Sequence, residues 1–276
     1  MRLRSEGILF RPVFLWTSIL VGSSALAVES SSEGARFGFA AELQASSSLH
    51  AWDDSLHRAD LSATLNPTYR FSSAYTLGAV AVIVQDLSDS RELRSQKTQI
   101  YLTRSEISLS PTLELNVTGS ANIPLSRIER DNQQLITTLR IAPRLLFTAP
   151  ESWGWEVSAF YDLGFARHLH EYSTTLDGKA NPRYSLSHRL NAVAPIYKKL
   201  AFETNFTFTT AWTYEGAIKN QFNWDQALSL GLSEHFTASV GHTNSGSGLK
   251  ANGVDSNISL YNPNSSSAFL SLEYIL

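Results

Sequence analysis

The chain has 276 residues and a mass of 30.5 kDa, enough for one large domain or two small ones. Charged residues make up 17%, below the roughly 25% of an average soluble domain, yet the mean hydropathy of -0.12 is too polar for a bundle of membrane helices. The absence of cysteine excludes disulfide frameworks, zinc ribbons, iron–sulfur centres and thiol catalysis. The net charge of -3 argues against nucleic acid as a partner. With 11% aromatic residues, this composition predicts a β protein that contacts lipid.

The N-terminal residues have the pattern of a secretory signal peptide. Three arginines precede an apolar run of 15 residues (13–27), and this run ends in Ala-Leu-Ala, a small-x-small cleavage pattern. A membrane-spanning helix needs about 20 apolar residues, so the run is short for an uncleaved anchor, which is the alternative. We therefore expect residues 1–27 to be removed on export, residues 28–35 to form a short periplasmic segment, and residues 36–276 to form one β domain.

Most of the remaining sequence alternates between apolar and polar residues, which is the period of a β-strand. Between residues 113 and 123, every odd position is apolar or small and every even position is polar. Twelve such segments are predicted, and they begin near Arg36, Ala59, Tyr75, Gln99, Leu113, Leu135, Trp155, Tyr184, Leu200, Gln221, Phe236 and Ser267. Because residues 75–84 are apolar on both faces, strand counts from about 10 to 14 stay open.

The connections between these segments alternate in length. Short turns are predicted at residues 72–74, 110–112, 150–152, 195–199 and 233–235. Longer polar loops are predicted at residues 50–54, 88–97, 126–134, 170–183, 215–220 and 244–265. Short turns at one end and long loops at the other are typical of a transmembrane β-barrel, with both termini at the short-turn, periplasmic end.

The last residues of the chain continue a strand pattern. Counting back from the end, the residues on one face are Leu276, Tyr274, Leu272, Leu270 and Ala268. This pattern resembles the terminal strand of Gram-negative outer-membrane β-barrel proteins, although that strand usually ends in Phe. The resemblance is to the superfamily and to no particular member. It implies an all-β fold, a single antiparallel barrel of about 12 strands. It also implies a place in the outer membrane, contact with lipid and lipopolysaccharide, and recognition of the C-terminal strand by the barrel-assembly machinery.

Aromatic residues gather near the predicted strand ends. Tyr69, Phe71 and Tyr75 lie near short turns, whereas Tyr101 and Trp212 lie near long loops. Two belts of amphipathic aromatic side chains at the membrane interfaces are expected of such a barrel.

The polar face of the strands predicts what lines the lumen. The inward cations are predicted to be Arg70, Arg104, Arg140, Arg144 and Arg189. The inward anions are predicted to be Glu42, Asp60, Glu106, Glu114, Glu156, Asp162, Glu203, Asp225 and Glu273. These charges could pair and fill the barrel, or they could line a constriction that selects ions. A barrel of this size lies between filled barrels of about 8 strands and open porins of roughly 16–18 strands, which favours a narrow channel for ions or small hydrophilic solutes.

Two other functions stay open. A closed structural barrel could bind partners through its long loops. A lipid hydrolase at the rim is suggested by His242, because outer-membrane phospholipase and lipid A deacylase barrels carry a similar short His-x-Ser-Asn run, in which Ser is the nucleophile and His its base. Here Ser245 stands three residues from His242, and residues three apart on a strand point to opposite faces. The sequence therefore favours a protein without enzymatic activity.

Metal and cofactor sites find little support in the sequence. His168 and His170 share a strand face, but no third ligand is visible. His50 and His57 flank two aspartates with no clearer pattern, and the oxygen-rich turn at 252–257 lacks the spacing of an EF-hand loop. We predict no metal, no cofactor and no nucleic-acid module.

Overall fold

The computed structural model describes residues 36–51, 54–88, 91–150, 152, 154, 157–250 and 252–276. The predicted signal peptide (1–27), the predicted periplasmic segment (28–35) and Glu156 lie outside the described residues. Within those described ranges, no helix is long and apolar enough to cross a membrane.

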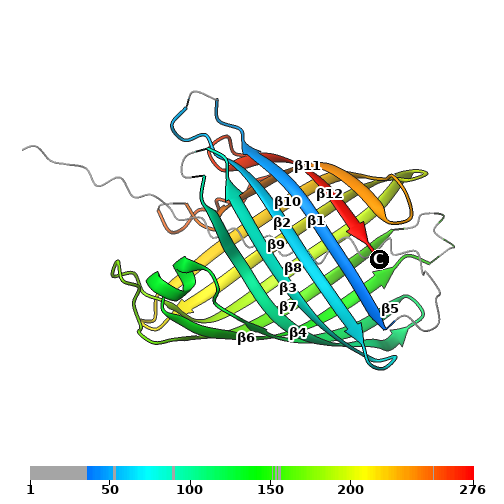
Figure 1. The fold of residues 1–276 in the computed structure, drawn as a ribbon, viewed down its shortest axis with the longest axis horizontal. Coiled ribbons are helices and arrows are strands. Elements are labelled where there is room, and N and C mark those ends of the chain that lie inside the picture. The colour runs from blue at the N-terminus through cyan, green and yellow to red at the C-terminus, as the bar shows by residue number, and fades with distance from the viewer. Residues whose placement is uncertain are drawn as a thin grey trace, which may run out of the picture.

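Twelve strands close into one antiparallel barrel (Figure 1). They are β1 (Phe37–Ser48), β2 (Ala59–Arg70), β3 (Tyr75–Asp86), β4 (Leu93–Ser110), β5 (Leu113–Asn122), β6 (Leu135–Thr148), β7 (Ser158–His170), β8 (Pro182–Tyr197), β9 (Leu200–Thr213), β10 (Ile218–Gly231), β11 (Phe236–Ser247) and β12 (Ser266–Ile275). A short π-helix, η2 (Ile128–Asn132), lies in the β5–β6 connection. Each strand pairs with its neighbours in sequence, and β1 pairs with β12 to close the sheet. The predicted fold and strand number are therefore confirmed.

Most long connections lie at one end of the barrel, on the left in Figure 1, and the short turns lie at the other. The β9–β10 connection differs from the expected loop at 215–220, because β10 begins at Ile218 rather than near Gln221. A tight turn joins these strands: the Thr213 amide donates to the Ala217 carbonyl at 2.9 Å, and Gly216 has a φ of 83°. Glycine adopts this left-handed conformation without the steric cost of a side chain.

The two faces of the sheet follow from the strand register, because directly paired residues share a face. The outer face carries exposed apolar side chains on every side of the barrel, including Leu43, Leu65, Leu102, Ile141, Leu190 and Leu270. The inner face is mostly serine, threonine, asparagine and charged residues, as in the paired positions of β1 and β2. Because the sheet is closed, it leaves no unpaired edge, and its exterior is apolar. Both conditions are required of a β-structure in lipid.

Candidate functional site

A group of basic side chains projects into the lumen from three strands. Arg140 and Arg144 lie on the inner face of β6, Arg189 on that of β8, and Lys97 on that of β4. Lys97 is within electrostatic range of both Arg140 and Arg189, so the four cations face a common region of the lumen. We call Lys97, Arg140, Arg144 and Arg189 the basic arc.

Lys97 is a member of this group that the sequence analysis missed. The loop predicted at 88–97 included it, whereas β4 begins at Leu93. Lys97 pairs with the inward Val82, and its strand continues through Gln99 and Tyr101 on the same face. The alternation of residues 97–102 was the signal that could have extended the strand.

One member of the basic arc forms an ion pair on the inner wall. Arg144 donates through Nε and Nη2 to the two carboxylate oxygens of Asp162, at 2.7 and 2.9 Å. The Asp162 side chain is 5% exposed and that of Arg144 is 20% exposed. The guanidinium also lies 4.2 Å from the centre of the Phe160 ring. A bidentate pair of this kind compensates for taking a carboxylate out of bulk water.

A chain of polar side chains continues around the wall from β8 to β11. Arg189 Nε donates to Asn205 Oδ1 at 2.7 Å, and Asn205 Nδ2 donates to Asp225 Oδ2 at 3.0 Å. Asp225 also accepts from Asn223 Nδ2 at 2.7 Å, and Thr243 Oγ1 donates to Asn223 Oδ1 at 3.2 Å. Each side chain is thus held by its neighbour, which orients the Arg189 guanidinium.

Arg140 lies along the wall because its neighbour on β7 is a glycine. A Cβ at position 164 would collide with the Arg140 guanidinium, so Gly164 leaves the room that this side chain occupies. Arg140 Nη2 donates to Ser187 Oγ at 3.2 Å. The Arg140 side chain is therefore held against β7 and β8.

Carboxylates gather on a different part of the inner wall. Glu42 of β1 is directly paired with Glu273 of β12, and it is within electrostatic range of Glu203 on β9. Asn191 Nδ2 donates to Glu203 Oε1 at 2.8 Å. The lumen thus has a basic part on β4, β6 and β8 and an acidic part on β1, β9 and β12.

The inner face of β3 is apolar in its middle, from Gly78 to Val84, with Thr76 and Asp86 at its ends. Tyr101 of β4 packs against this face, and its hydroxyl donates to Asn66 Oδ1 at 2.7 Å. The sequence analysis placed Tyr101 in an interfacial belt, so its inward position is a correction. We call the buried residues of this face, Val80, Val82 and Val84, the valine strip.

The structure places most of the predicted lumen residues on the inner face. Those at inward register positions are Glu42, Asp60, Arg70, Glu114, Arg140, Arg144, Asp162, Arg189, Glu203, Asp225 and Glu273. Arg70 and Glu114 are exposed at the short-turn end, away from the basic arc. The part that these residues play in transport stays a prediction.

Arg104 and Glu106 are exceptions, because β4 contains a bulge between Arg104 and Ile107. Arg104 pairs with Tyr75 and Val117, which both face outward, so its predicted inward position is wrong. Glu106 lies in the bulge with a φ of 64°, its side chain is exposed, and its amide donates to Asn116 Oδ1 at 3.0 Å. A bulge contains an inserted residue, so inward and outward positions exchange on its far side. A prediction that assumes strict alternation along the strand misses this exchange.

The geometry does not bring together the residues of a lipid hydrolase. His242 pairs with the outward Gln226, and its ring lies 6.0 Å from that of Tyr261 in the β11–β12 loop. Ser245 pairs with the inward Asn223. His242 and Ser245 therefore lie on opposite faces of the wall. Their side chains point away from each other, whereas a base and its nucleophile must be within hydrogen-bond reach.

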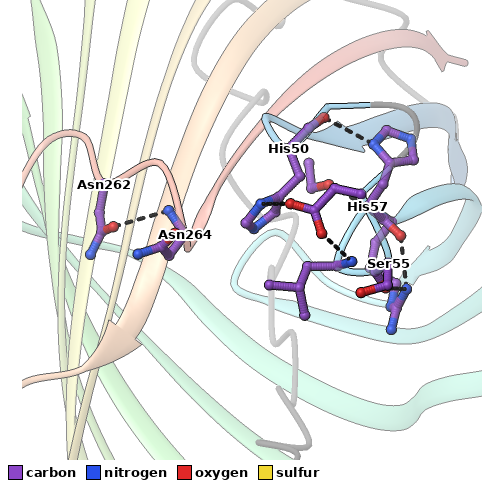
Figure 2. Close-up of polar contacts among 9 residues, drawn as sticks. His50, Ser55, His57, Asn262 and Asn264 are labelled. Carbon is purple, nitrogen blue, oxygen red and sulfur yellow. Dashed lines mark hydrogen bonds and ion pairs between the residues drawn. The ribbon is translucent and has the colours of Figure 1, made fainter.

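Three of the four histidines considered as metal ligands, His50, His57 and His168, have other partners. Both ring nitrogens of His168 lie 3.0 Å from hydroxyl oxygens. Figure 2 shows the His57 ring at the backbone carbonyl of His50, at 3.2 Å, while the His50 ring turns towards Asp54, at 3.4 Å. Within the described ranges, no three His, Asp or Glu side chains are placed to hold a metal ion.

The loops at the long-loop end are tied to one another. Asn181 is 1% exposed, and its Nδ2 donates to the carbonyls of Gln133 and Tyr172 at 3.1 and 3.0 Å. The Leu176 amide donates to the Asn132 carbonyl at 3.0 Å. These bonds join the β5–β6 and β7–β8 connections into one layer.

Glu129 and Asp177 are two of the loop carboxyls with shifted pKa values. Burial raises the pKa of Glu129 above its usual value, although a hydrogen bond from Asn122 at 3.0 Å opposes the shift. Hydrogen bonds from Thr175 and Lys179 lower the pKa of Asp177 to about 2. Asp177 is therefore ionised at neutral pH, and Lys179 compensates its charge at 2.9 Å.

No family model and no curated protein matches the sequence. Among solved structures, the NanC porin aligns with a TM-score of 0.54 and 9% identity, over 86% of this chain and 100% of that one. The COG4313 outer membrane channel from Pseudomonas putida F1 aligns with a TM-score of 0.56 and 10% identity, over 87% of this chain and 95% of that one. At these identities the likeness concerns the fold, which is that of an outer-membrane β-barrel.

Proposed function

We propose that this chain is an outer-membrane channel for ions or small hydrophilic solutes. The observation that carries the proposal is the basic arc, a set of wall-supported cations that face one region of a polar lumen. Charged groups at a constriction attract ions of opposite sign and so determine which solutes pass. The apolar exterior, the closed sheet and the fold shared with outer-membrane barrels support the membrane location.

The sign of the charge at the basic arc favours anions. Asp162 neutralises Arg144, and Asn205 links Asp225 to Arg189 by hydrogen bonds, with Asp225 also within electrostatic range of that arginine. Among the ion pairs of the described residues, none includes Arg140 or Lys97. Glu129 is within electrostatic range of Lys97, so the positive excess of the arc rests on Arg140, and small anionic solutes are the class that it would attract.

Conductance of the purified mature protein in planar bilayers tests this function. We expect discrete current steps, and a reversal potential under a salt gradient that shows a preference for anions. Arg140→Gln removes one wall-supported charge and should lower the anion-to-cation permeability ratio about twofold or more. Arg104→Gln is the matched control, because it removes the same charge from the outer face.

Two outcomes would contradict the proposal. A folded barrel that passes no current above background would favour the closed barrel that acts through its loops. Equal shifts of the reversal potential in the Arg140 and Arg104 variants would mean that the basic arc does not face the conducting path.

A further inference from the structure

Two arginines lie on tyrosine rings at the long-loop end of β7 and β8. The Arg167 guanidinium lies 4.4 Å from the centre of the Tyr184 ring, and that of Arg183 lies 5.3 Å from the same ring. Both also approach the Tyr214 ring, at 5.7 and 5.9 Å. We call Arg167, Arg183, Tyr184 and Tyr214 the rim cluster. Contact with the aromatic rings restricts the conformations of the two guanidinium groups and keeps both beside the same two rings.

Arg167 and Tyr184 of the rim cluster lie on the outer face of the barrel. Arg167 pairs with Leu139 on one side and with Tyr184 on the other, and Leu139 is 50% exposed on the outer face. Tyr184 also stacks on Phe165, at 5.9 Å, and Phe165 is 46% exposed. The cluster therefore continues the apolar outer surface at the point where the strands reach the loops.

The positive charge of the rim cluster is not compensated by the described carboxylates. Neither Arg167 nor Arg183 takes part in an ion pair of the described residues. Arg167 Nη1 makes a long hydrogen bond, 3.4 Å, to the Arg183 carbonyl, and the Arg183 side chain is exposed. Each guanidinium has five N–H donors, so most of this donor capacity is available to a ligand.

We propose that the rim cluster binds the phosphate of a phosphorylated glycolipid in the outer leaflet. Two preorientated guanidinium groups match the oxygens of a phosphate, which accepts paired N–H donors. The lipid source is favoured over a free anion because the cluster borders Phe165 and Leu139 on the lipid-facing surface. Tyrosine rings at this level are those that meet lipid headgroups. The inference rests on the outer-membrane location in the proposed function, but not on conduction.

Titration of the purified barrel with defined ligands tests the rim cluster. The probes are phosphorylated lipid A, the same lipid after removal of its phosphates, and inorganic phosphate, with native mass spectrometry as the readout. The wild type should prefer the phosphorylated lipid, and Arg167→Gln/Arg183→Gln should weaken its binding at least about tenfold. Arg127→Gln is the matched control, since Arg127 is an exposed arginine of the β5–β6 connection at the same end, paired with Asp131 at 3.6 Å.

The lysine variant, the lipid without phosphates and inorganic phosphate distinguish this proposal from the alternatives. Arg167→Lys/Arg183→Lys keeps the charge but loses the planar fork, so it should bind more weakly than the wild type. Equal binding of the lipid without phosphates, undiminished binding by the glutamine variant, full binding by the lysine variant, or equally tight binding of inorganic phosphate would each overturn the proposal. Heat-modifiable migration verifies that each variant is folded, and its conductance is measured separately, so that a failed channel and a failed lipid site are distinguishable.

Discussion

The inner wall of the barrel has two unlike regions. On β3, the valine strip packs under Tyr101, and contact between apolar surfaces holds this region together. From β6 to β11, the wall carries the ion pair of Arg144 with Asp162 and then a chain of side-chain hydrogen bonds from Arg189 to Thr243. One barrel thus uses a packed apolar contact on one side and a polar network on the other. The comparison teaches that a membrane barrel can keep its polar lumen on one part of the wall and pack the rest as a small core.

The two regions should respond differently to substitution. The stability that apolar packing provides declines gradually as atoms are removed, because each contact contributes little. A polar network in a low-dielectric interior loses much more stability when one partner is removed, because the other partner is left without a hydrogen bond.

The largest effect is expected at the ion pair of the polar region. Arg144→Met leaves the Asp162 carboxylate, 5% exposed, without its bidentate partner. The free energy of unfolding should fall by about 3 kcal/mol. Urea unfolding of the barrel in lipid vesicles measures the change. The double variant Arg144→Met/Asp162→Leu is the control and should recover most of the loss, because it removes both charges. A single variant as stable as the wild type would show that water already solvates Asp162.

An intermediate effect is expected where the valine strip meets Tyr101. A Cβ at Gly78 would collide with the Tyr101 ring, so Gly78→Ala should displace the ring and break its hydrogen bond to Asn66. The expected loss is about 2 kcal/mol, from the hydrogen bond and the packing together. Gly119→Ala is the matched control, because a Cβ there meets nothing within 4 Å. Equal stability of the two alanine variants in the same urea assay would mean that Tyr101 does not rest on β3.

The smallest effect is expected within the valine strip. Val82→Thr keeps the shape of the side chain but places a hydroxyl among Val80 and Val84. If this surface is dry, the free energy of unfolding should fall by about 1 kcal/mol. Urea unfolding of this variant, compared with that of the wild type, checks the value. No loss of stability would show that water reaches the strip and that the contrast between the two regions is incomplete.

Much of this architecture could be predicted from the sequence, because the alternation of apolar and polar residues has the period of a strand. β2, β5 and β9 begin at the predicted Ala59, Leu113 and Leu200. The errors have local physical causes. The bulge between Arg104 and Ile107 reverses the order of inward and outward residues along β4.

The partners within the candidate site were not predictable in the same way. The alternation of apolar and polar residues placed Arg140 and Arg189 on the inner face. It carries no information about which neighbour each side chain would contact. The position of Arg140 depends on the missing side chain of Gly164, and the orientation of Arg189 depends on Asn205 of the next strand. Tyr101 likewise faces inward because Gly78 opens a place for its ring. Such contacts arise between strands, and the pattern within one strand does not contain them.

The pairing of the first strand with the last has a consequence for how the molecule forms. β1 and β12 are joined through nine paired positions, from Ala40 with Ile275 to Ser48 with Ser267, so these contacts span nearly the whole described sequence. Contacts of such high sequence separation require the closure of a very long loop, which slows folding. Until they form, the other strands can pair only as an open sheet with two free edges, a form that invites pairing with other chains. The final seam is therefore the step at which a catalyst of membrane insertion would act with most effect.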